Sequence, residues 1–322
     1  MNRFLMFLVM LWTAALTIPA SAQNYPQRPI RLVIGLAAGG PSDVMARTVA
    51  QELGDRLGQQ VVVDNKPGVG GNLAADLVAK SPPDGYTLFF TSTGPLAVSP
   101  SLFSKLPYDP IKDFSPVGLV ANLPLVLFVP ATLPVRNLDD LLASARARPG
   151  QLMYASAGNG ATTHLAMELL KSAAGVDIQH VPYKGTAAAM PDLISGQVHA
   201  MLDGWSGSEP MVKAGKLRAI AVAVDKRISV APDLPTIAES GFPGFNASPW
   251  YGIVAPAGTP KAVIERLSKE LKATMAAASV RTKFATLGME PLSDSPDEFA
   301  EFIKSETTKW AKVVKVSGAK VD

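Results

Sequence analysis

The sequence predicts an α/β protein of two domains, with mixed, mostly parallel sheets flanked by helices and a ligand cleft between the domains. The chain has 322 residues, which is about two domains by length. Short runs of Val, Ile and Leu alternate with helical patterns almost to the end, as in parallel sheets covered on both faces. Two proline-rich passages, Asp113–Pro134 and Ala231–Pro260, mark where the chain leaves one domain and returns to it. We therefore predict a discontinuous first domain, residues 25–122 plus 250–322, and an inserted second domain, residues 123–249.

The individual elements follow one another in order along the chain. Each strand is a short apolar run, and the helices fill most of the gaps between them. Strands are predicted at Ile30–Gly35, Gln60–Val63, Tyr86–Thr91, Pro116–Val120, Leu125–Val129, Leu152–Ala155, Ile178–Val181, Val198–Leu202, Leu217–Val224 and Trp250–Ala255. Helices are predicted at Asp43–Leu57, Asn72–Lys80, Leu138–Arg148, Thr163–Ala174, Ala187–Ser195, Glu209–Ala214, Lys261–Ala278, Val280–Leu287 and Pro296–Val316. The helical end has no strand after it, which indicates that it packs back on an earlier sheet.

The N-terminus carries the pattern of an export signal. Arg3 precedes the apolar run Phe4–Leu16, Pro19 interrupts any helix, and Ala20-Ser21-Ala22 supplies the small residues that signal peptidase reads. We expect cleavage after Ala22, so that residues 1–22 form the signal peptide and the mature protein is exported. The alternative is an N-terminal membrane anchor, but the apolar run is shorter than the ~20 residues that a spanning helix needs.

The composition excludes several kinds of site. The chain has no cysteine, so disulfides, thiolate metal sites and cysteine nucleophiles are excluded. Its 30 basic and 27 acidic residues are interspersed, and the net charge of +3 is not typical of a nucleic-acid-binding surface. The three histidines, His164, His180 and His199, do not follow metal-ligand spacing, so no metal site is expected.

Two stretches come close to known motifs and then depart from them. Gly68–Leu73 ends in leucine where the dinucleotide-binding pattern requires glycine, so no nucleotide cofactor is expected. Gly204–Ser208 ends in serine where a nucleophile elbow requires glycine. A serine hydrolase also needs a later histidine, and none follows His199. The sequence therefore predicts a binding protein without cofactor rather than an enzyme.

Three strands run through a glycine-rich turn directly into a helix. In each turn, backbone N–H groups and the positive end of a helix dipole meet at one point, which suits an anionic ligand. Ligands of open α/β sheets bind at the carboxyl ends of strands, so we expect the turns of both domains to face the cleft. The sequence therefore predicts a receptor for a small carboxylate. The three turns are Ala37–Asp43, Asn65–Asn72 and Ser156–His164.

Most candidate ligand-binding residues come from the first and third of these turns. Asp43 lies in the first turn of a helix, where it either contacts ligand or caps the helix. Ser156–Thr163 is the better anion site, because glycines flank Asn159 and threonine hydroxyls lie at a helix N-terminus. His164 either contacts ligand or holds this loop by a hydrogen bond. The candidates from these two turns are Leu36, Ala38, Gly39, Gly40, Asp43, Ser156, Ala157, Gly158, Asn159, Gly160, Thr162 and His164.

Six further candidates lie at the carboxyl ends of other strands. Lys184 either neutralises a second ligand carboxylate or is a solvated surface lysine. Asp203 either accepts from a ligand ammonium or hydroxyl or caps the helix after it. Trp205 either offers an apolar face to an aromatic or sizeable apolar ligand or packs beneath the following helix. The six are Ser92, Thr93, Tyr183, Lys184, Asp203 and Trp205.

Eight motifs follow one another along the mature chain: Tyr25–Arg31 with Ala38-Gly39-Gly40 and Asp43, Asn65–Asn72, Pro83–Leu88, Leu106–Pro110 with Lys112–Phe114, Tyr154–Gly160 with His164-Leu165, Val181–Gly185, Ala214–Ala219 and Ala255–Pro260. In their order and spacing they resemble the motifs of the tripartite tricarboxylate transporter substrate-binding proteins, the Bug or TctC family. Each motif is weak by itself, whereas eight in register over the whole mature chain are specific.

The resemblance implies a periplasmic binding protein of type II-like fold whose two domains close over a small organic acid. It implies as partners the large and small integral membrane subunits of a secondary transporter, and we expect a monomer that is neither membrane-embedded nor bound to nucleic acid. A periplasmic sensor that presents a bound carboxylate to a signalling receptor is the alternative. The chain departs from the family pattern at Gly35-Leu36-Ala37 and Gly204–Gly207, so the ligand's identity is not carried over.

Overall fold

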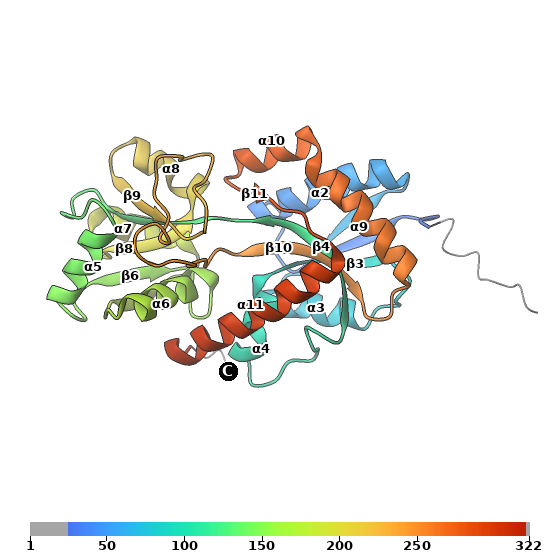
Figure 1. Ribbon diagram of the computed structural model, residues 1–322, viewed down its shortest axis with the longest axis horizontal. Helices are drawn as coiled ribbons and strands as arrows, with labels where there is room; N and C mark the ends of the chain where they lie inside the picture. Colours follow the sequence, from blue (N-terminus) through green and yellow to red (C-terminus); the bar gives the residue numbers. More distant parts are fainter. Residues whose placement is uncertain (1–24, 320–322) are drawn as a thin grey trace, which may run out of the picture.

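Two separate β-sheets form the framework of the protein. The computed structural model describes residues 25–319, so the predicted signal peptide lies outside the described residues (Figure 1). The first sheet contains β1 (Ile30–Ile34), β2 (Val61–Asn65), β3 (Thr87–Ser92), β4 (Phe114–Asn122), β10 (Trp250–Pro256) and β11 (Glu290–Pro291), in the order β11-β4-β10-β3-β1-β2. The second contains β5 (Leu125–Pro130), β6 (Met153–Ser156), β7 (Gln179–Pro182), β8 (Ala200–Gly204) and β9 (Leu217–Val222), in the order β7-β6-β8-β5-β9.

Helices flank both sheets, so the fold is the α/β class that the sequence predicts. Around the first sheet lie α2 (Pro41–Leu57), α3 (Asn72–Ala79), α9 (Lys261–Ala276) and α10 (Ala278–Thr286), with the short η2 (Val69–Gly71), η3 (Gly94–Val98) and α4 (Ser99–Leu102). Around the second lie α5 (Leu138–Ala147), α6 (Thr162–Ala174), α7 (Thr186–Ser195) and α8 (Trp205–Lys213). The last helix is α11 (Pro296–Ser317). Within residues 25–319 no helix combines the length and the apolar composition that crossing a bilayer requires.

Both sheets are mixed, and antiparallel pairing is more extensive than the sequence predicted. β1 pairs in parallel with β2 and β3, and β6 pairs in parallel with β7 and β8. Helices connect most of these strands, as parallel pairing requires. In contrast, β10 is antiparallel to β3 and β4, and β5 is antiparallel to β8 and β9. β5 and β10 are the strands that follow the two passages of the chain from one sheet to the other.

The two passages between the sheets lie side by side. The Leu123 N–H donates to the Pro249 carbonyl at 2.8 Å, and the Leu125 N–H donates to the Ser248 hydroxyl at 3.1 Å. Figure 1 shows both segments running between the two lobes. The strands of each sheet therefore all belong to one of the two predicted domains. The exact division, at residues 122/123 and 249/250, stays a prediction.

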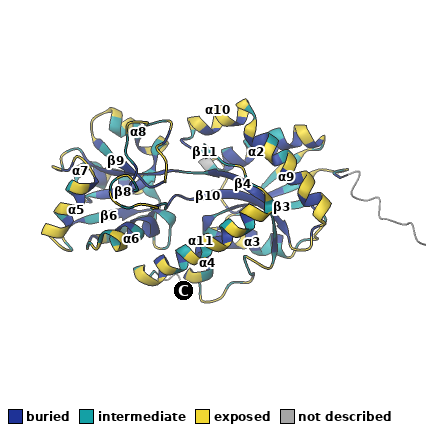
Figure 2. Ribbon diagram, in the orientation of Figure 1, coloured by how far each residue is buried: buried dark blue, intermediate teal, exposed yellow. Residues whose placement is uncertain are grey.

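The core follows from the apolar strands. Every residue of β5 and β10 is buried, and the outer faces of the helices carry the exposed positions (Figure 2). The predicted helical end packs on an earlier sheet, because both α9 and α11 contact β4. Four short elements, η2, η3, α4 and β11, were not predicted. α8 begins at Trp205 rather than at Glu209, which places Trp205 in a helix instead of at the end of a strand.

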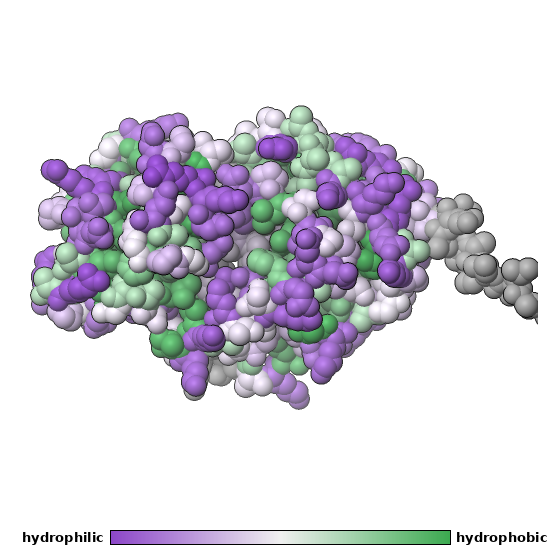
Figure 3. Space-filling view, in the orientation of Figure 1, coloured by the Kyte–Doolittle hydropathy of each residue, from purple (hydrophilic) through white to green (hydrophobic). Residues whose placement is uncertain are grey.

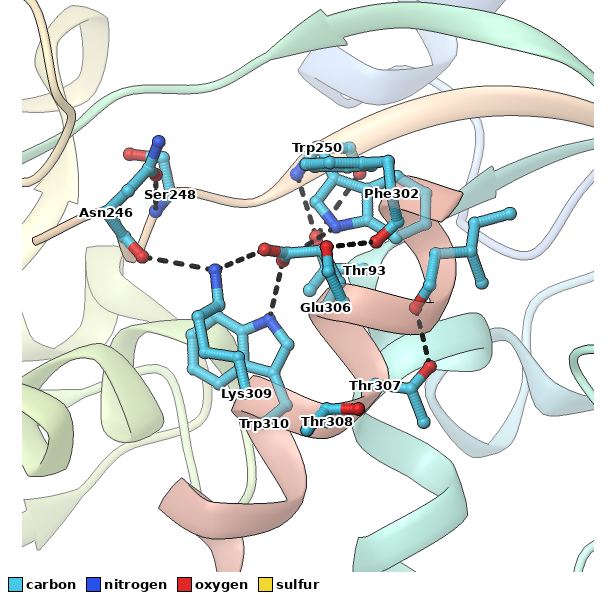
Figure 4. A network of polar contacts seen from close by, with 12 residues as sticks. Thr93, Asn246, Ser248, Trp250, Phe302, Glu306, Thr307, Thr308, Lys309 and Trp310 are labelled. Carbon is cyan, nitrogen blue, oxygen red and sulfur yellow. Dashed lines mark hydrogen bonds and ion pairs between the residues drawn. The ribbon is translucent and has the colours of Figure 1, made fainter. Parts of the chain in front are cut away.

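The last helix, α11, contacts both lobes and holds a buried carboxylate between them. Glu306 is only 7% exposed and accepts hydrogen bonds from the indole N–H groups of Trp250 and Trp310, at 3.0 and 2.9 Å (Figure 4). Lys309 pairs with Glu306 and donates to the Asn246 carbonyl at 3.1 Å. α11 also packs on α6 of the other lobe. The network therefore ties the returning chain before β10 to the C-terminal helix.

Candidate ligand-binding cleft

A cleft of about 560 Å³ lies where strand ends of the two sheets face each other. On the face drawn in Figure 3 the surface is notched between the two lobes. A second hollow, about 770 Å³, lies along α2 and β2, and none of the three glycine-rich turns opens into it. The cleft is lined by Leu36, Val69, Gly70, Ser92, Thr93, Gly94, Val98, Ser99, Leu102, Phe103, Leu123, Leu125, Ala157, Gly158, Asn159, Gly160, Ala161, Thr162, Thr163, Thr186, Asp203, Gly204, Pro249 and Tyr251.

Half of the predicted site residues line this cleft. They come from both lobes and include most of the third glycine-rich turn. The residues that line it are Leu36, Ser92, Thr93, Ala157, Gly158, Asn159, Gly160, Thr162 and Asp203. The remaining predicted residues, which do not line it, are Ala38, Gly39, Gly40, Asp43, Ser156, His164, Tyr183, Lys184 and Trp205.

The loop between β6 and α6 places a helix N-terminus in the cleft. Gly158 and Gly160 have φ values of +132° and +72°, a region that glycine adopts more easily than residues with a Cβ atom. These two positions turn the chain so that Ala161 becomes the N-cap residue of α6. The side chain of the N-cap residue accepts no hydrogen bond from the N–H groups of the first turn. The N–H groups around Thr162 therefore remain available to a ligand. The positive end of the helix dipole points to the same place.

Ser156 and His164 support this loop from behind. The Gly158 N–H donates to the Ser156 hydroxyl at 3.1 Å, and the Gly160 N–H donates to His164 Nδ1 at 3.0 Å. The Ala157 N–H donates to the Thr163 hydroxyl at 2.9 Å. Ser156 is fully buried and His164 nearly so. Of the two roles considered for His164, the structure shows the hydrogen bond that holds the loop.

A second histidine completes this support. His180 Nε2 lies 2.6 Å from Ser156 Oγ, and its ring stacks on His164 with centroids 3.9 Å apart and planes 5° apart. The Tyr154 ring also stacks with His180, at a centroid distance of 4.9 Å. Burial lowers the pKa of both histidines, and His164 beside it helps to lower the pKa of His180 to about 4. Both rings are therefore neutral at neutral pH. The sequence offered no signal for this pair.

Asp43 caps its own turn instead of facing the cleft. Its carboxylate is 4% exposed and accepts from the Gly39 N–H at 3.0 Å, from Arg47 Nε at 2.9 Å and from Asn65 Nδ2 at 2.9 Å. The hydrogen bond from Arg47 lowers the pKa of Asp43 to about 2. This carboxylate lies at the N-terminus of α2, and no residue of the first glycine-rich turn lines the cleft; only Leu36, just before the turn, does.

Asp203 lies in the cleft beside the α6 loop. Its carboxylate accepts from the side chains of Thr186 and Ser208 and from the Gly204 N–H, with the Ser208 hydroxyl at 3.4 Å. Burial nevertheless raises the pKa of Asp203, because these donors only partly replace water. No Lys, Arg or His is among the lining residues. Asp203 is thus the one charged side chain that this cleft presents.

Three of the predicted residues lie outside the cleft: Tyr183, Lys184 and Trp205. The Tyr183 hydroxyl donates to the Asp192 carboxylate at 2.6 Å, and Lys184 is exposed outside the cleft. Trp205 packs against Phe128 with ring centroids 6.3 Å apart. Of the two roles considered for Trp205, the structure shows packing rather than a ligand-facing indole.

The lining thus divides into a polar and an apolar part. On the second-sheet side, the N-termini of α6, α7 and α8 reach the cleft at Thr162, Thr186 and Gly204. The first-sheet elements and the segments next to them carry apolar side chains that the sequence analysis missed, because these segments show no clear periodicity. These are Val69, Val98, Leu102, Phe103 and Leu123. Among the described residues no cluster of His, Asp and Glu could hold a metal ion. Such a site can bind an organic anion with an apolar portion.

Two α/β lobes around a cleft of this kind are the architecture of a solute-binding protein. The chain belongs to the tripartite tricarboxylate transporter receptor family: the family model described as "Tripartite tricarboxylate transporter family receptor" matches residues 45–319. Protein BugT of Bordetella pertussis is 40% identical over 310 residues, which cover 96% of this chain and 95% of BugT.

Solved structures of similar proteins agree with this membership. Rpa4515 of R. palustris with adipate is 38% identical, with a TM-score of 0.78 over 92% of this chain and all of that one. The periplasmic binding protein BugD is 37% identical, with a TM-score of 0.75 over the same shares. MatC (Rpa3494) from Rhodopseudomonas palustris with bound malate is 34% identical, with a TM-score of 0.74 over 90% of this chain and all of that one.

Proposed function

We propose that the protein is a periplasmic receptor that captures a small organic acid and delivers it to the membrane subunits of a tripartite tricarboxylate-type secondary transporter. The observation that carries this proposal is the uncapped N-terminus of α6, which opens into a cleft between the two lobes. Similar proteins were solved with adipate and malate, and both of these ligands are carboxylates. The receptor binds and releases its ligand unchanged, without a cofactor.

The site recognises a carboxylate through backbone N–H groups and helix dipoles instead of a basic side chain. Such groups are fixed by the fold and need no reorganisation when the anion arrives. The predicted site residues that line the cleft make up this proposed site, together with Thr163 and Thr186. Among the remaining predicted residues, Asp43, Ser156 and His164 hold neighbouring loops by hydrogen bonds. Export with cleavage after Ala22 brings the mature protein to the periplasm, where it acts as a monomer.

A glycine substitution tests the anion site. Gly158→Val adds a β-branched side chain at φ +132°, with its Cβ atom about 3.3 Å from the Tyr183 carbonyl, and so displaces the loop. We expect calorimetry to show a loss of carboxylate affinity of at least ~100-fold, or about 2.7 kcal/mol, while circular dichroism shows a folded protein.

The matched control is Gly175→Val, at the other end of α6. Gly175 also has positive φ, +62°, but it lies outside the cleft and has nothing within 4 Å of an added Cβ. Its variant should lose some stability and keep its affinity. Equal affinity of Gly158→Val and the parent would contradict the anion site. Transport is tested separately, by asking whether uptake into vesicles that contain the large and small membrane subunits depends on the receptor.

A further inference from the structure

We propose that the ligand is a monocarboxylate that carries a hydrogen-bond donor, a hydroxyl or an ammonium group, on the carbon next to its carboxylate and is otherwise apolar. This inference rests on the proposed function, because it takes the α6 N-terminus as the place of the carboxylate. It adds the part of the ligand that faces Asp203 and the part that lies against the first-sheet side of the cleft.

The sheet places Asp203 beside the carboxylate position. β6 and β8 are parallel neighbours, with Tyr154 opposite Ala200 and Ala155 opposite Met201. Continuing this register by two residues sets Asp203 opposite Ala157, where the α6 loop begins. Neighbouring strands are about 4.8 Å apart, so Asp203 lies beside the start of the loop that leads into α6, and both Asp203 and Thr162 line the same cleft.

Asp203 can accept more hydrogen bonds than the protein gives it. A carboxylate has about four acceptor positions. The donors around it are the Gly204 N–H and the Thr186 and Ser208 side chains, of which Ser208 is at the long distance of 3.4 Å. No cationic side chain lines the cleft. A ligand hydroxyl or ammonium completes this arrangement, whereas a ligand carboxylate at the same place would meet a like charge.

The first-sheet side of the cleft is suited to an apolar group. Leu36 and Val69 line the cleft and are 37% and 61% exposed, which makes them two of the most exposed large apolar residues described. Phe103 and Leu123 extend the same apolar lining. Val69 also has φ +47°, a conformation unfavourable for a β-branched residue, so the fold presents a valine here against its backbone preference. A ligand that covers these side chains removes apolar surface from water.

A matched series of acids tests the donor. The series is 2-hydroxy-4-methylpentanoate, 2-amino-4-methylpentanoate, and 4-methylpentanoate without a donor, measured by calorimetry on the parent protein. We expect at least one of the first two to bind roughly tenfold or more tighter than the third, since a hydrogen bond to a charged group contributes this much. Which of the two binds tighter tells whether the donor is a hydroxyl or an ammonium group. If 4-methylpentanoate binds as tightly as both, the inference is wrong.

Two variants locate the effect. Asp203→Asn should abolish the preference for the acid with the donor, whereas Asp177→Asn, an exposed control in the same lobe, should keep that preference. Leu36→Ser should weaken the binding of the apolar acids roughly fivefold. Because the acid series is read on the parent protein, a variant that fails to fold does not end the test.

The outcomes separate this inference from the proposed function. Tighter binding of adipate and 2-hydroxybutanedioate than of every acid in the series would overturn the inference and leave a carboxylate receptor. An unchanged preference in folded Asp203→Asn would do the same. Failure of every mono- and dicarboxylate to bind would overturn the proposed function itself.

Discussion

At the residue scale, the anion site depends on two neutral histidines behind a loop. His180 lies 2.6 Å from Ser156, whose hydroxyl accepts from the Gly158 N–H, and His164 accepts from the Gly160 N–H. Neither ring can be protonated without disturbing the other, because the two are stacked at 3.9 Å. The loop's shape is therefore linked to their protonation.

This linkage predicts a loss of stability in acid. His180 has a pKa of about 4 in the folded protein, against about 6.5 unfolded, so its contribution to stability is complete above pH 6.5 and is lost as the pH falls toward 4. Glu168 and Lys171, which also face the pair, form an ion pair with each other. Urea unfolding at pH 7.5 and pH 5 should show that the parent loses on the order of 1 kcal/mol more than His180→Gln. Equal losses would contradict a buried neutral His180.

Residue types and spacing identified the α6 loop, but they did not identify the contacts of single charged or aromatic side chains. Gly158, Asn159 and Gly160 were predictable because two glycines before a helix restrict the chain to few conformations. For Asp43 and Trp205 the sequence left two roles open, because spacing does not reveal the partner of a side chain. Asp43 is held by Asn65, 22 positions along the chain, and Trp205 packs on Phe128 of a neighbouring strand.

At the scale of elements, the buried carboxylate of Glu306 holds α11 in position. Glu306→Gln would remove the charge that two indole N–H groups and Lys309 share. Charge-assisted hydrogen bonds are the strong ones, so we expect the free energy of unfolding to fall by about 2–4 kcal/mol in urea titrations. Glu301→Gln, exposed on the same helix and paired with Lys304, should cost less than about 0.5 kcal/mol. Similar costs for both variants would show that the buried network contributes little.

Long elements were predictable and short ones were not. The strands of both sheets and the long helices show clear apolar patterns, so their existence followed from the sequence. Residues 94–102 form η3 and α4 in the structure, but two prolines and no sustained periodicity hid them. This segment supplies Val98, Ser99 and Leu102 to the cleft, and its omission left the apolar wall unpredicted.

At the scale of the whole molecule, the function requires groups from two lobes to meet one ligand. The sequence predicted a cleft between two sheets because the strand ends of open α/β sheets collect their loops on one edge. It could not predict that β5 and β10 pair antiparallel to their neighbours, since an apolar run looks the same whichever direction it takes.

This arrangement predicts closure on binding. A ligand that contacts both lobes favours the closed form of an existing equilibrium. Solution scattering should show a smaller radius of gyration when the protein is saturated with an acid that stabilises it against heat. An unchanged radius at saturation would indicate a rigid, preformed pocket.

The central claim is that the N-terminus of α6 binds a ligand carboxylate inside the cleft. A crystal structure with the tightest-binding acid tests it most directly. The account predicts carboxylate oxygens about 2.7–3.2 Å from the first backbone N–H groups of α6, near Thr162 and Thr163. A carboxylate bound elsewhere, with these N–H groups facing only water, would contradict it.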